Sequence, residues 1–356
     1  MKYLIVQEWE NTEGNHAGMK HMCDMLVSAY ADQYKMIAIP PPSQFKISNN
    51  AKICKLLEKI HIFKPNVLFK RHYYHIAKSL SKILRQEDEI FLLEYLVPHV
   101  PQNILANYIR QHVPMLKIYA MAHLTPSWYK SYCDDYENFI KNSVRDIDVL
   151  LTLGSSASSF FSSFKIKSLK IDTGKHYVDS SYYGRTNSAH KSDKPVVISM
   201  GNMQRNYSIL TDIIKQCHDV DFIICHGKRK LDPEFQKYDN VRAVGFVPED
   251  ILRGLMQDSD ISLNIMDDTV GSNVITTSMS MGLAIIASDV GSIRDYCTNN
   301  NCIFCENTVE SFVSAIHAMS KMQGTVLDKM KESSIEISRQ LSIEYVHSWF
   351  SGLDRL

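Results

Sequence analysis

The sequence predicts an α/β protein made of two Rossmann-like, doubly wound parallel-sheet domains. Short apolar runs alternate with helical segments along both halves of the chain. The alternation is interrupted by one polar, glycine-bearing stretch, which has the composition of an interdomain linker. The length of 356 residues suits two domains of ordinary size. The expected parts are a first Rossmann-like domain at 1–172, the linker at 173–194, a second Rossmann-like domain at 195–341 and a final helix at 342–356.

The apolar runs of the first half are expected to form one parallel sheet. They are Tyr3–Val6, Lys35–Ile39, Val67–Phe69, Phe91–Glu94, Leu116–Ala122 and Val149–Leu153. Helices are expected at Met19–Tyr30, at Ala51–Ile60 and after Gly154. In this interpretation the basic and aromatic residues at 70–75 follow a strand. They then either face the ligand-binding edge of the sheet or form a solvated loop.

The second half repeats the pattern. Its expected strands are Val196–Met200, Phe222–Cys225, Val241–Pro248, Asp260–Ile265, Ala284–Ala287 and Cys302–Cys305. Its expected helices are Tyr207–Cys217, one starting near Pro248, 271–282, Val309–Met322, Val326–Leu341 and Ser342–Phe350.

Composition excludes several classes of protein. Lys plus Arg equals Asp plus Glu, at 39 each, which argues against a dedicated nucleic-acid binder. The first apolar run is too short for a signal peptide, and no run approaches the roughly 20 apolar residues of a membrane span. A cytoplasmic protein is expected, with contact at the inner face of a membrane left open.

The eight cysteines are scattered, mostly in apolar runs, as buried free thiols of a reducing compartment are. Cys302 and Cys305 have the spacing of a zinc or redox pair. They flank Ile-Phe in an expected strand and no second pair stands nearby, so we favour buried thiols and expect no metal site.

Three turns of the second half carry groups that suit a phosphate. Gly271, Ser272 and Asn273 open a helix whose free amides and dipole favour an anion. Arg205, in the turn that begins with Gly201 and Asn202, could contact phosphate oxygens bidentately. Lys228 lies in a third turn, at 227–230. Because these turns follow parallel strands, we expect them at one edge of one sheet, around the diphosphate of an activated sugar.

Two features of the first half also point to that edge. A loop with Gly14, Asn15 and Gly18 follows the first strand and can bring backbone amides close to a ligand. His123 stands just past a strand end, where functional residues of α/β sheets collect. The first strand is not followed by Gly-x-Gly-x-x-Gly, which argues against a nicotinamide dehydrogenase.

These motifs carry a family likeness. Residues 196–350 resemble the nucleotide-binding half of GT-B-fold glycosyltransferases, especially the retaining family four (glycosyl transferases group 1). The matching segments are the turn 201–206, Val-Gly-Phe-Val-Pro at 244–248, Asp-Ile-Ser-Leu-Asn at 260–264 and 278–292 with its Asp-Val-Gly. The first half matches more loosely, through its glycine loop and His123.

The resemblance implies a UDP- or GDP-linked sugar donor held in a cleft between the domains, with no cofactor, metal or nucleic acid. It implies that Gly271, Ser272, Asn273 and Arg205 hold the diphosphate, and that His123 approaches the donor sugar. The acceptor, a glycan, lipid-linked or protein molecule, would lie on the first domain, and the final helix would return to it. The expected catalytic residues are His123, Arg205 and Asp268. The other expected donor contacts are Gly14, Asn15, Gly18, Gly201, Asn202, Lys228, Gly245, Phe246, Val247, Thr269 and Thr277.

The chain departs from the family pattern at two positions. The family usually carries two glutamates where this sequence has Thr269 and Thr277, although Asp267 or Asp268 could replace the first. A threonine offers only a weaker, neutral hydrogen bond. The leading hypothesis is a retaining glycosyltransferase of bacterial surface-glycan synthesis. The alternatives are a nucleotide-sugar epimerase using Glu94, Asp267 or Asp268, and a binding subunit without catalysis.

Overall fold

The computed structural model describes residues 1–10, 12, 14–45, 67–132, 134–186, 194–228, 235, 237–322 and 324–353. The helix expected at Ala51–Ile60 lies outside these residues. The chain forms two compact units: unit 1 comprises 1–153 and 158–174, and unit 2 comprises 154–157 and 175–356. The final helix clusters with unit 2, and its docking on the first domain stays a prediction.

Unit 1 is built on a six-stranded parallel sheet in the order β2-β1-β3-β4-β5-β6. Its strands are β1 Lys2–Gln7, β2 Tyr34–Ile39, β3 Glu89–Leu92, β4 Lys117–Ala122, β5 Val149–Thr152 and β6 Lys170–Thr173. The α-helices of this half are α1 Met19–Ala29, α3 Val67–Leu80, α4 Gln102–His112, α5 Pro126–Tyr132, α6 Tyr136–Ser143 and α7 Ser155–Ser162, with 3₁₀ turns at Pro42–Phe45 and Val144–Asp146.

The expected strand at Val67–Phe69 is wrong, because these residues open the helix α3. Phe69, Tyr73, Ala77 and Leu80 are its buried residues, and their spacing of four and three is helical. Tyr73, which was expected in a strand-end loop, is instead on the core face of the helix. Its hydroxyl donates to Gln7 Oε1 at 3.0 Å.

The edge strand β6 was not expected from the sequence. It is four residues long and only partly buried, and it carries Lys170 and Asp172. Short, charged edge strands are common because they discourage pairing with another chain, but they lack the apolar run that marks an interior strand. β6 therefore completes the first sheet, and only its last residue, Thr173, falls within the predicted linker.

Unit 2 is built on a second six-stranded parallel sheet, in the order β12-β11-β10-β7-β8-β9. Its strands are β7 Val196–Met200, β8 Asp221–Gly227, β9 Val241–Gly245, β10 Ile261–Asn264, β11 Ala284–Ser288 and β12 Cys302–Cys305. Its helices are α8 Leu210–Ile214, α9 Glu249–Gln257, α10 Asn273–Ser280, α11 Ile293–Tyr296, α12 Val309–Ser320, α13 Thr325–Arg339 and α14 Ile343–Gly352.

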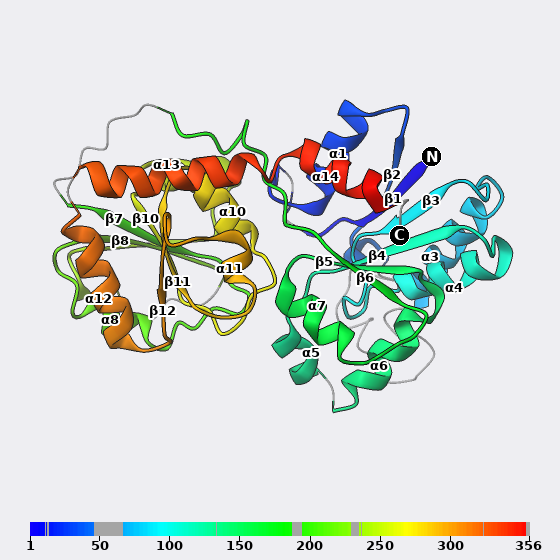
Figure 1. Cartoon of the computed structure of the whole chain (residues 1–356), viewed down its shortest axis with the longest axis horizontal. Coiled ribbons are helices and arrows are strands. Elements are labelled where there is room, and N and C mark those ends of the chain that lie inside the picture. The colour runs from blue at the N-terminus through cyan, green and yellow to red at the C-terminus, as the bar shows by residue number, and fades with distance from the viewer. Residues whose placement is uncertain are drawn as a thin grey trace. The chain divides into compact units, whose positions relative to one another are not determined.

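Helices cover both faces of this second sheet. Figure 1 shows α10 and α13 along one face and α8 and α12 along the other. Both groups bury their apolar sides against the strands, and the resulting core includes Leu263, Ile286, Phe312 and Met330. The predicted α/β class with two doubly wound sheets is confirmed. Across the described parts of the chain, no helix has both the length and the apolarity needed to span a bilayer.

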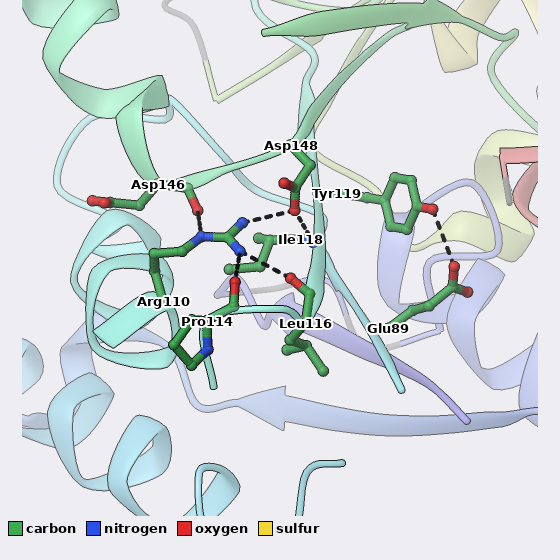
Figure 2. A network of polar contacts seen from close by, with 8 residues as sticks. All are labelled: Glu89, Arg110, Pro114, Leu116, Ile118, Tyr119, Asp146 and Asp148. Atoms are coloured by element: carbon green, nitrogen blue, oxygen red, sulfur yellow. Dashed lines mark hydrogen bonds and ion pairs between the residues drawn. The ribbon is translucent and has the colours of Figure 1, made fainter. Parts of the chain in front are cut away.

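The Arg110 side chain links the segments that lead into β4 and β5 through hydrogen bonds and an ion pair (Figure 2). Arg110 of α4 donates to the carbonyl oxygens of Pro114 at 2.6 Å and Leu116 at 3.1 Å, and to Asp148 Oδ2 at 2.7 Å. The same Asp148 oxygen accepts from the Ile118 amide at 2.8 Å. Arg110 Nε also donates to the Asp146 carbonyl at 3.3 Å, so the planar guanidinium serves four acceptors at once, one more than the three donors of an ammonium group.

We expect Arg110→Met to lower the free energy of unfolding by roughly 2 kcal/mol, because several acceptors lose their donor. Arg110→Lys should recover less than half of this loss. Denaturant unfolding measures the change. Lys141→Met is the control, since Lys141 forms an exposed pair with Glu137 and should cost under about 0.5 kcal/mol. If Arg110→Met and Lys141→Met lowered the free energy of unfolding equally, the stabilising role of Arg110 would be contradicted.

Candidate functional site

The point where the strand order of unit 2 reverses lies between β7 and β10. Counted along unit 2 alone, the order is 3-2-1-4-5-6, the arrangement of dinucleotide-binding sheets, in which ligands bind beyond the carboxyl ends of the strands at the reversal. The turn that starts at Gly201 follows β7, and the loop leading to α10 follows β10. The two segments singled out for phosphate binding therefore flank the same crevice.

Gly201 brings the two segments into contact. Its φ of +94° is a conformation that favours glycine. A Cβ added at Gly201 would lie 3.1 Å from Arg205 Nε and 3.1 Å from Val274 Cγ2. The Arg205 side chain therefore lies beside the first turn of α10, as the sequence predicted for a shared anion site.

The Arg205 guanidinium is partly buried and has a neutral partner. Nη1 donates to Asn264 Oδ1 at 2.9 Å, and a backbone bridge to Met266 fixes the turn. Burial lowers the pKa of Arg205 to about 10, so the group stays charged at neutral pH. No carboxylate of the described residues pairs with it. Because desolvated charges in proteins are normally paired, this cation suits an anionic ligand.

The N-terminus of α10 is also open to an anion. Ser272 is the N-cap residue, yet its side chain makes no capping hydrogen bond, and the first turn contains no acidic residue. Gly271 has a φ of +113°, which turns the chain into the helix. The free amides and the helix dipole thus face the same region as Arg205.

The loop before α10 is held rigidly by the loop after β11. Ser292 donates its amide proton to the Thr269 carbonyl at 2.7 Å. Gly291, with a φ of +55°, packs so closely that an added Cβ would lie 2.2 Å from that carbonyl oxygen. Asp268 Oδ1 accepts from the Thr269 amide at 2.8 Å, so this carboxylate helps to shape the loop. Its catalytic role stays a prediction.

The two threonines that replace the family's glutamates are buried. Thr277 Oγ1 donates to the Asn273 carbonyl inside the helix at 2.6 Å. The Thr269 hydroxyl lies 3.4 Å from the Gly271 amide. With its proton engaged inside α10, Thr277 can offer a ligand only an acceptor. Donor contacts by both residues stay predictions.

The ends of β8 and β9 carry the residues expected near the base. Gly227 has a φ of +61°, and an added Cβ would lie 2.8 Å from Asn202 Nδ2, so Asn202 lies against the end of β8. Lys228 Nζ lies 5.1 Å from the centre of the Phe246 ring, and 57% of Phe246 is exposed. Gly201, Asn202, Lys228, Gly245 and Phe246 thus lie at or just beyond the carboxyl ends of β7, β8 and β9, and their contacts with a donor stay predictions. Lys228 is the last described residue of its turn.

Unit 1 holds an acid–histidine pair beyond the ends of β3 and β4, next to the reversal of its strand order between β1 and β3. Glu94 follows β3 and His123 follows β4. His123 Nε2 lies 2.9 Å from Glu94 Oε2, with 22% and 4% of the two side chains exposed. Burial pulls the pKa of His123 down. The Glu94 charge and hydrogen bonds to Glu94 and the Leu93 backbone outweigh this effect, so the pKa is raised above its usual value.

A buried polar network supports this pair. Gln102 Oε1 accepts from the Glu94 amide at 3.0 Å, and Trp9 Nε1 donates to Glu94 Oε1 at 3.4 Å. Gln7, at the end of β1, donates to the Ile39 and Pro40 carbonyls at 3.0 and 2.8 Å. Three neighbouring strands therefore contribute to one fixed cluster.

The predicted glycine loop lies next to α1. Asn15 is at its centre: Oδ1 accepts from the Ala17 amide at 3.0 Å, and its carbonyl accepts from Gly18 at 3.3 Å. Gly14 has a φ of +72°. Gly18 is the N-cap residue of α1, without a side-chain cap. Donor binding by this loop stays a prediction.

Sequence reasoning missed Gln7, Trp9, Asn264 and the pairing role of Glu94. Each is a polar or amphipathic residue at or just beyond the carboxyl end of a strand, which was the available signal. Their partnerships depend on strand order, which the sequence pattern did not specify.

The cysteines of the Cys-x-x-Cys segment are on β12, as expected. Both side chains are buried, and burial raises the pKa of Cys305 to about 11, so its thiol stays protonated. The structure is therefore that of packed free thiols rather than of reactive thiolates.

Comparisons with known proteins agree with this geometry. Residues 194–321, all within unit 2, match the family described as Glycosyl transferases group 1. No curated protein sequence matches the chain.

Solved structures resemble the chain over its whole length. Sucrose-phosphate synthase from Thermosynechococcus elongatus gives a TM-score of 0.72 at 11% identity, covering 100% of this chain and 98% of that one. HepE of Anabaena, in complex with UDP and glucose, gives 0.73 at 14% identity, covering 100% of both chains. A glycosyltransferase from Rickettsia africae gives 0.65 at 15% identity, covering 96% and 95%. The expected GT-B fold is confirmed.

The charged pair of unit 1 predicts a pH dependence. Because the pKa of His123 is raised on folding, the pair stabilises the protein fully below about pH 6.5, and this stabilisation is lost as pH rises through the folded pKa. Glu94→Gln removes the negative charge that raises the pKa of His123, and burial then dominates. The pKa of His123 should therefore fall below about 6.5 in this variant.

Histidine-selective NMR titration measures this pKa. Glu137→Gln, which removes an exposed carboxylate on α6, is the control and should leave the His123 titration unchanged. A His123 pKa that is equal or higher in Glu94→Gln would refute the pairing.

Proposed function

We propose that the protein is a glycosyltransferase that moves a sugar from a nucleotide-sugar donor to an acceptor. The observation that carries this proposal is the charged Arg205, which has no carboxylate partner among the described residues and lies beside the N-terminus of α10, where Ser272 makes no capping bond. Both groups favour an anion, and together they suit the two phosphates of a nucleotide diphosphate. The match of residues 194–321 to glycosyl transferases group 1 supports the same donor class.

The nucleotide lies along unit 2 in this proposal. Gly271, Ser272, Asn273 and Arg205 hold the diphosphate. The chain at Gly245–Val247 meets the base, with the exposed Phe246 ring near Lys228. UDP is the first donor nucleotide to test, because HepE of Anabaena was solved with UDP and glucose.

Catalysis is mainly electrostatic in this proposal. As the bond between the sugar and the diphosphate breaks, negative charge grows on the leaving phosphate, and fixed cationic and amide groups stabilise it. Retention is the favoured outcome. This preference rests on the likeness to the retaining family four. The anomeric configuration of the product, determined by NMR, distinguishes the two outcomes.

The setting we propose is bacterial surface-glycan synthesis, in the cytoplasm at the inner face of the membrane. The buried free thiols support a reducing compartment.

We expect Arg205→Gln to weaken binding of UDP or GDP by about 10- to 100-fold, because a charge-assisted contact contributes roughly 1.5–3 kcal/mol. The melting temperature without ligand should stay equal or rise. Glutamine can still donate to Asn264, and a desolvated charge has been removed. Thermal-shift titration with UDP, GDP and the matching nucleosides measures both effects.

Arg253→Gln is the matched control, since its guanidinium contacts the Tyr182 carbonyl at 3.2 Å and the Tyr182 ring. It should leave the diphosphate-induced shift intact. The proposed role of Arg205 is contradicted if Arg205→Gln binds UDP and GDP with the same affinity as the parent protein. It is also contradicted if the substitution weakens binding of the nucleosides as much as binding of the diphosphates.

Two alternative functions, an epimerase and a non-catalytic binding subunit, can be tested with the same purified protein. Incubating the protein with a nucleotide sugar and no acceptor reveals an epimerase through an epimerised donor. A binding subunit is suggested by the Thr277 hydroxyl, whose proton is engaged inside α10. It would bind nucleotide without turnover across a broad acceptor panel. Transfer of the sugar to any acceptor excludes the binding subunit.

A further inference from the structure

Helices α3 and α4 lie side by side in unit 1, and their sequences carry no carboxylate (Figure 1). The chain contains no Asp or Glu from 67 to 86, which includes α3, or from 95 to 133, which includes α4. The basic and aromatic stretch at 70–75 belongs to this part of the molecule, and the proposed donor site does not use it. A basic surface in a chain of zero net charge suits a partner that is locally anionic.

The cations of this surface come from α3 and the turn that follows it. The exposed ones are Lys70, Arg71, Lys78 and Lys82. Arg71, Lys78 and Lys82 follow one another at steps of seven and four, so they share one side of the helix, opposite its buried side. No carboxylate of the described residues forms an ion pair with any of the four.

Aromatic side chains connect the outer sides of the two helices. The Tyr74 ring of α3 is 44% exposed and lies edge to face with the Tyr108 ring of α4, with the ring centroids 5.0 Å apart. Tyr108 in turn stacks on His112, with the centroids 4.0 Å apart. Tyrosine is enriched where a bilayer meets water, because its ring is apolar and its hydroxyl can stay hydrated.

Apolar side chains are exposed where the two helices end. Ile83 follows α3 and is 59% exposed, and Met115 follows α4 and is 71% exposed. Because α3 leads into β3, α4 leads into β4, and these strands are parallel neighbours, both side chains lie at the same edge of the sheet. Exposed lysines, Lys82 and Lys117, stand next to them in the chain. Such a combination suits a membrane surface, where lysines reach the headgroups and apolar groups enter the acyl boundary.

We propose that these residues form a docking surface for an anionic phospholipid bilayer. The α3–α4 face consists of Lys70, Arg71, Tyr74, Lys78, Lys82, Ile83 and Met115. Clusters of about four to eight Lys and Arg on an amphipathic helix bind anionic lipids. The exposed apolar side chains favour a bilayer over a nucleic acid, whose phosphate backbone offers them no apolar partner. The inference rests on the proposed function only for its membrane setting.

Flotation of the full chain with lipid vesicles measures this binding. One vesicle contains equal parts of phosphatidylcholine and phosphatidylglycerol, and the other contains phosphatidylcholine alone. The protein should bind the anionic vesicle at least about tenfold more tightly. Lys78→Gln with Lys82→Gln should weaken this binding by roughly 25-fold, because each cation near an anionic surface contributes about fivefold. The melting temperature should not change, since both side chains are exposed.

Lys167→Gln with Lys170→Gln is the matched control. It removes the same charge from the same unit, in and just before β6, the edge strand at the opposite end of the sheet from β2. Vesicle binding should stay at the level of the parent protein.

Ile83→Ser with Met115→Ser tests the apolar part of the α3–α4 face. Binding to the anionic vesicle should fall by at least about fivefold, because apolar area no longer enters the bilayer. The inference is overturned if this variant binds the vesicle as tightly as the parent, if the two vesicles bind equally, or if the control loses as much binding as Lys78→Gln with Lys82→Gln. It is also overturned if polyuridylic acid displaces the parent protein from the anionic vesicle, which would identify a nucleic acid as the partner.

Each variant is also titrated with UDP and GDP, which separates this inference from the proposed function. Lys78→Gln with Lys82→Gln should keep the nucleotide-induced thermal shift, and Arg205→Gln should keep vesicle binding. Vesicle binding without any nucleotide binding would overturn the proposed function and support the docking surface.

Discussion

The charge of Arg205 is the constraint on which the organisation of unit 2 depends. A partly buried guanidinium whose side-chain partner among the described residues is Asn264 is costly, and its depressed pKa reflects that cost. The surrounding backbone is arranged to keep it in place. Gly201 leaves room for its side chain, and a backbone bridge joins its residue to Met266 after β10. The reversal of strand order then sets this cation next to the first turn of α10. Under the proposed function, this loss of stability is the cost of a site that holds an anion.

In unit 1, by contrast, the buried ionisable side chains at the strand ends lie next to each other. Beside its reversal point, Glu94 raises the pKa of His123 and also accepts from Trp9. The described lining of the pocket beyond β1 and β2 carries three carboxylates and one lysine. The net charge of the chain is zero, which argues against a nucleic-acid-binding protein. An overall charge of zero does not reveal that the two units differ in local charge.

Much of the architecture could be predicted from the sequence, because a buried parallel strand is a short apolar run and its partner helix has a periodic apolar face. The errors have physical causes. Residues 67–69 form such a run, yet Tyr73, Ala77 and Leu80 extend its apolar face with helical spacing. β6 is a partly exposed edge strand with two charged residues and so lacks the signal. The residues of the two crevices could be placed at strand ends, but not paired, because Glu94 meets Trp9 across a separation of 85 positions.

The two threonines alter what the crevice of unit 2 can recognise under the proposed function. Carboxylates at these positions would add negative charge near the diphosphate and would accept strongly from sugar hydroxyls. Thr269 and Thr277 remove that charge, and the Thr277 proton is engaged inside α10. The attraction of Arg205 for phosphate is then less opposed, while selection among ribose and donor-sugar hydroxyls is weaker. The exposed Phe246 ring adds a stacking surface that accepts any base, so discrimination between nucleotides falls to the backbone at Gly245–Val247. Under the proposed function, such a site binds the diphosphate more strongly than it distinguishes what the diphosphate carries.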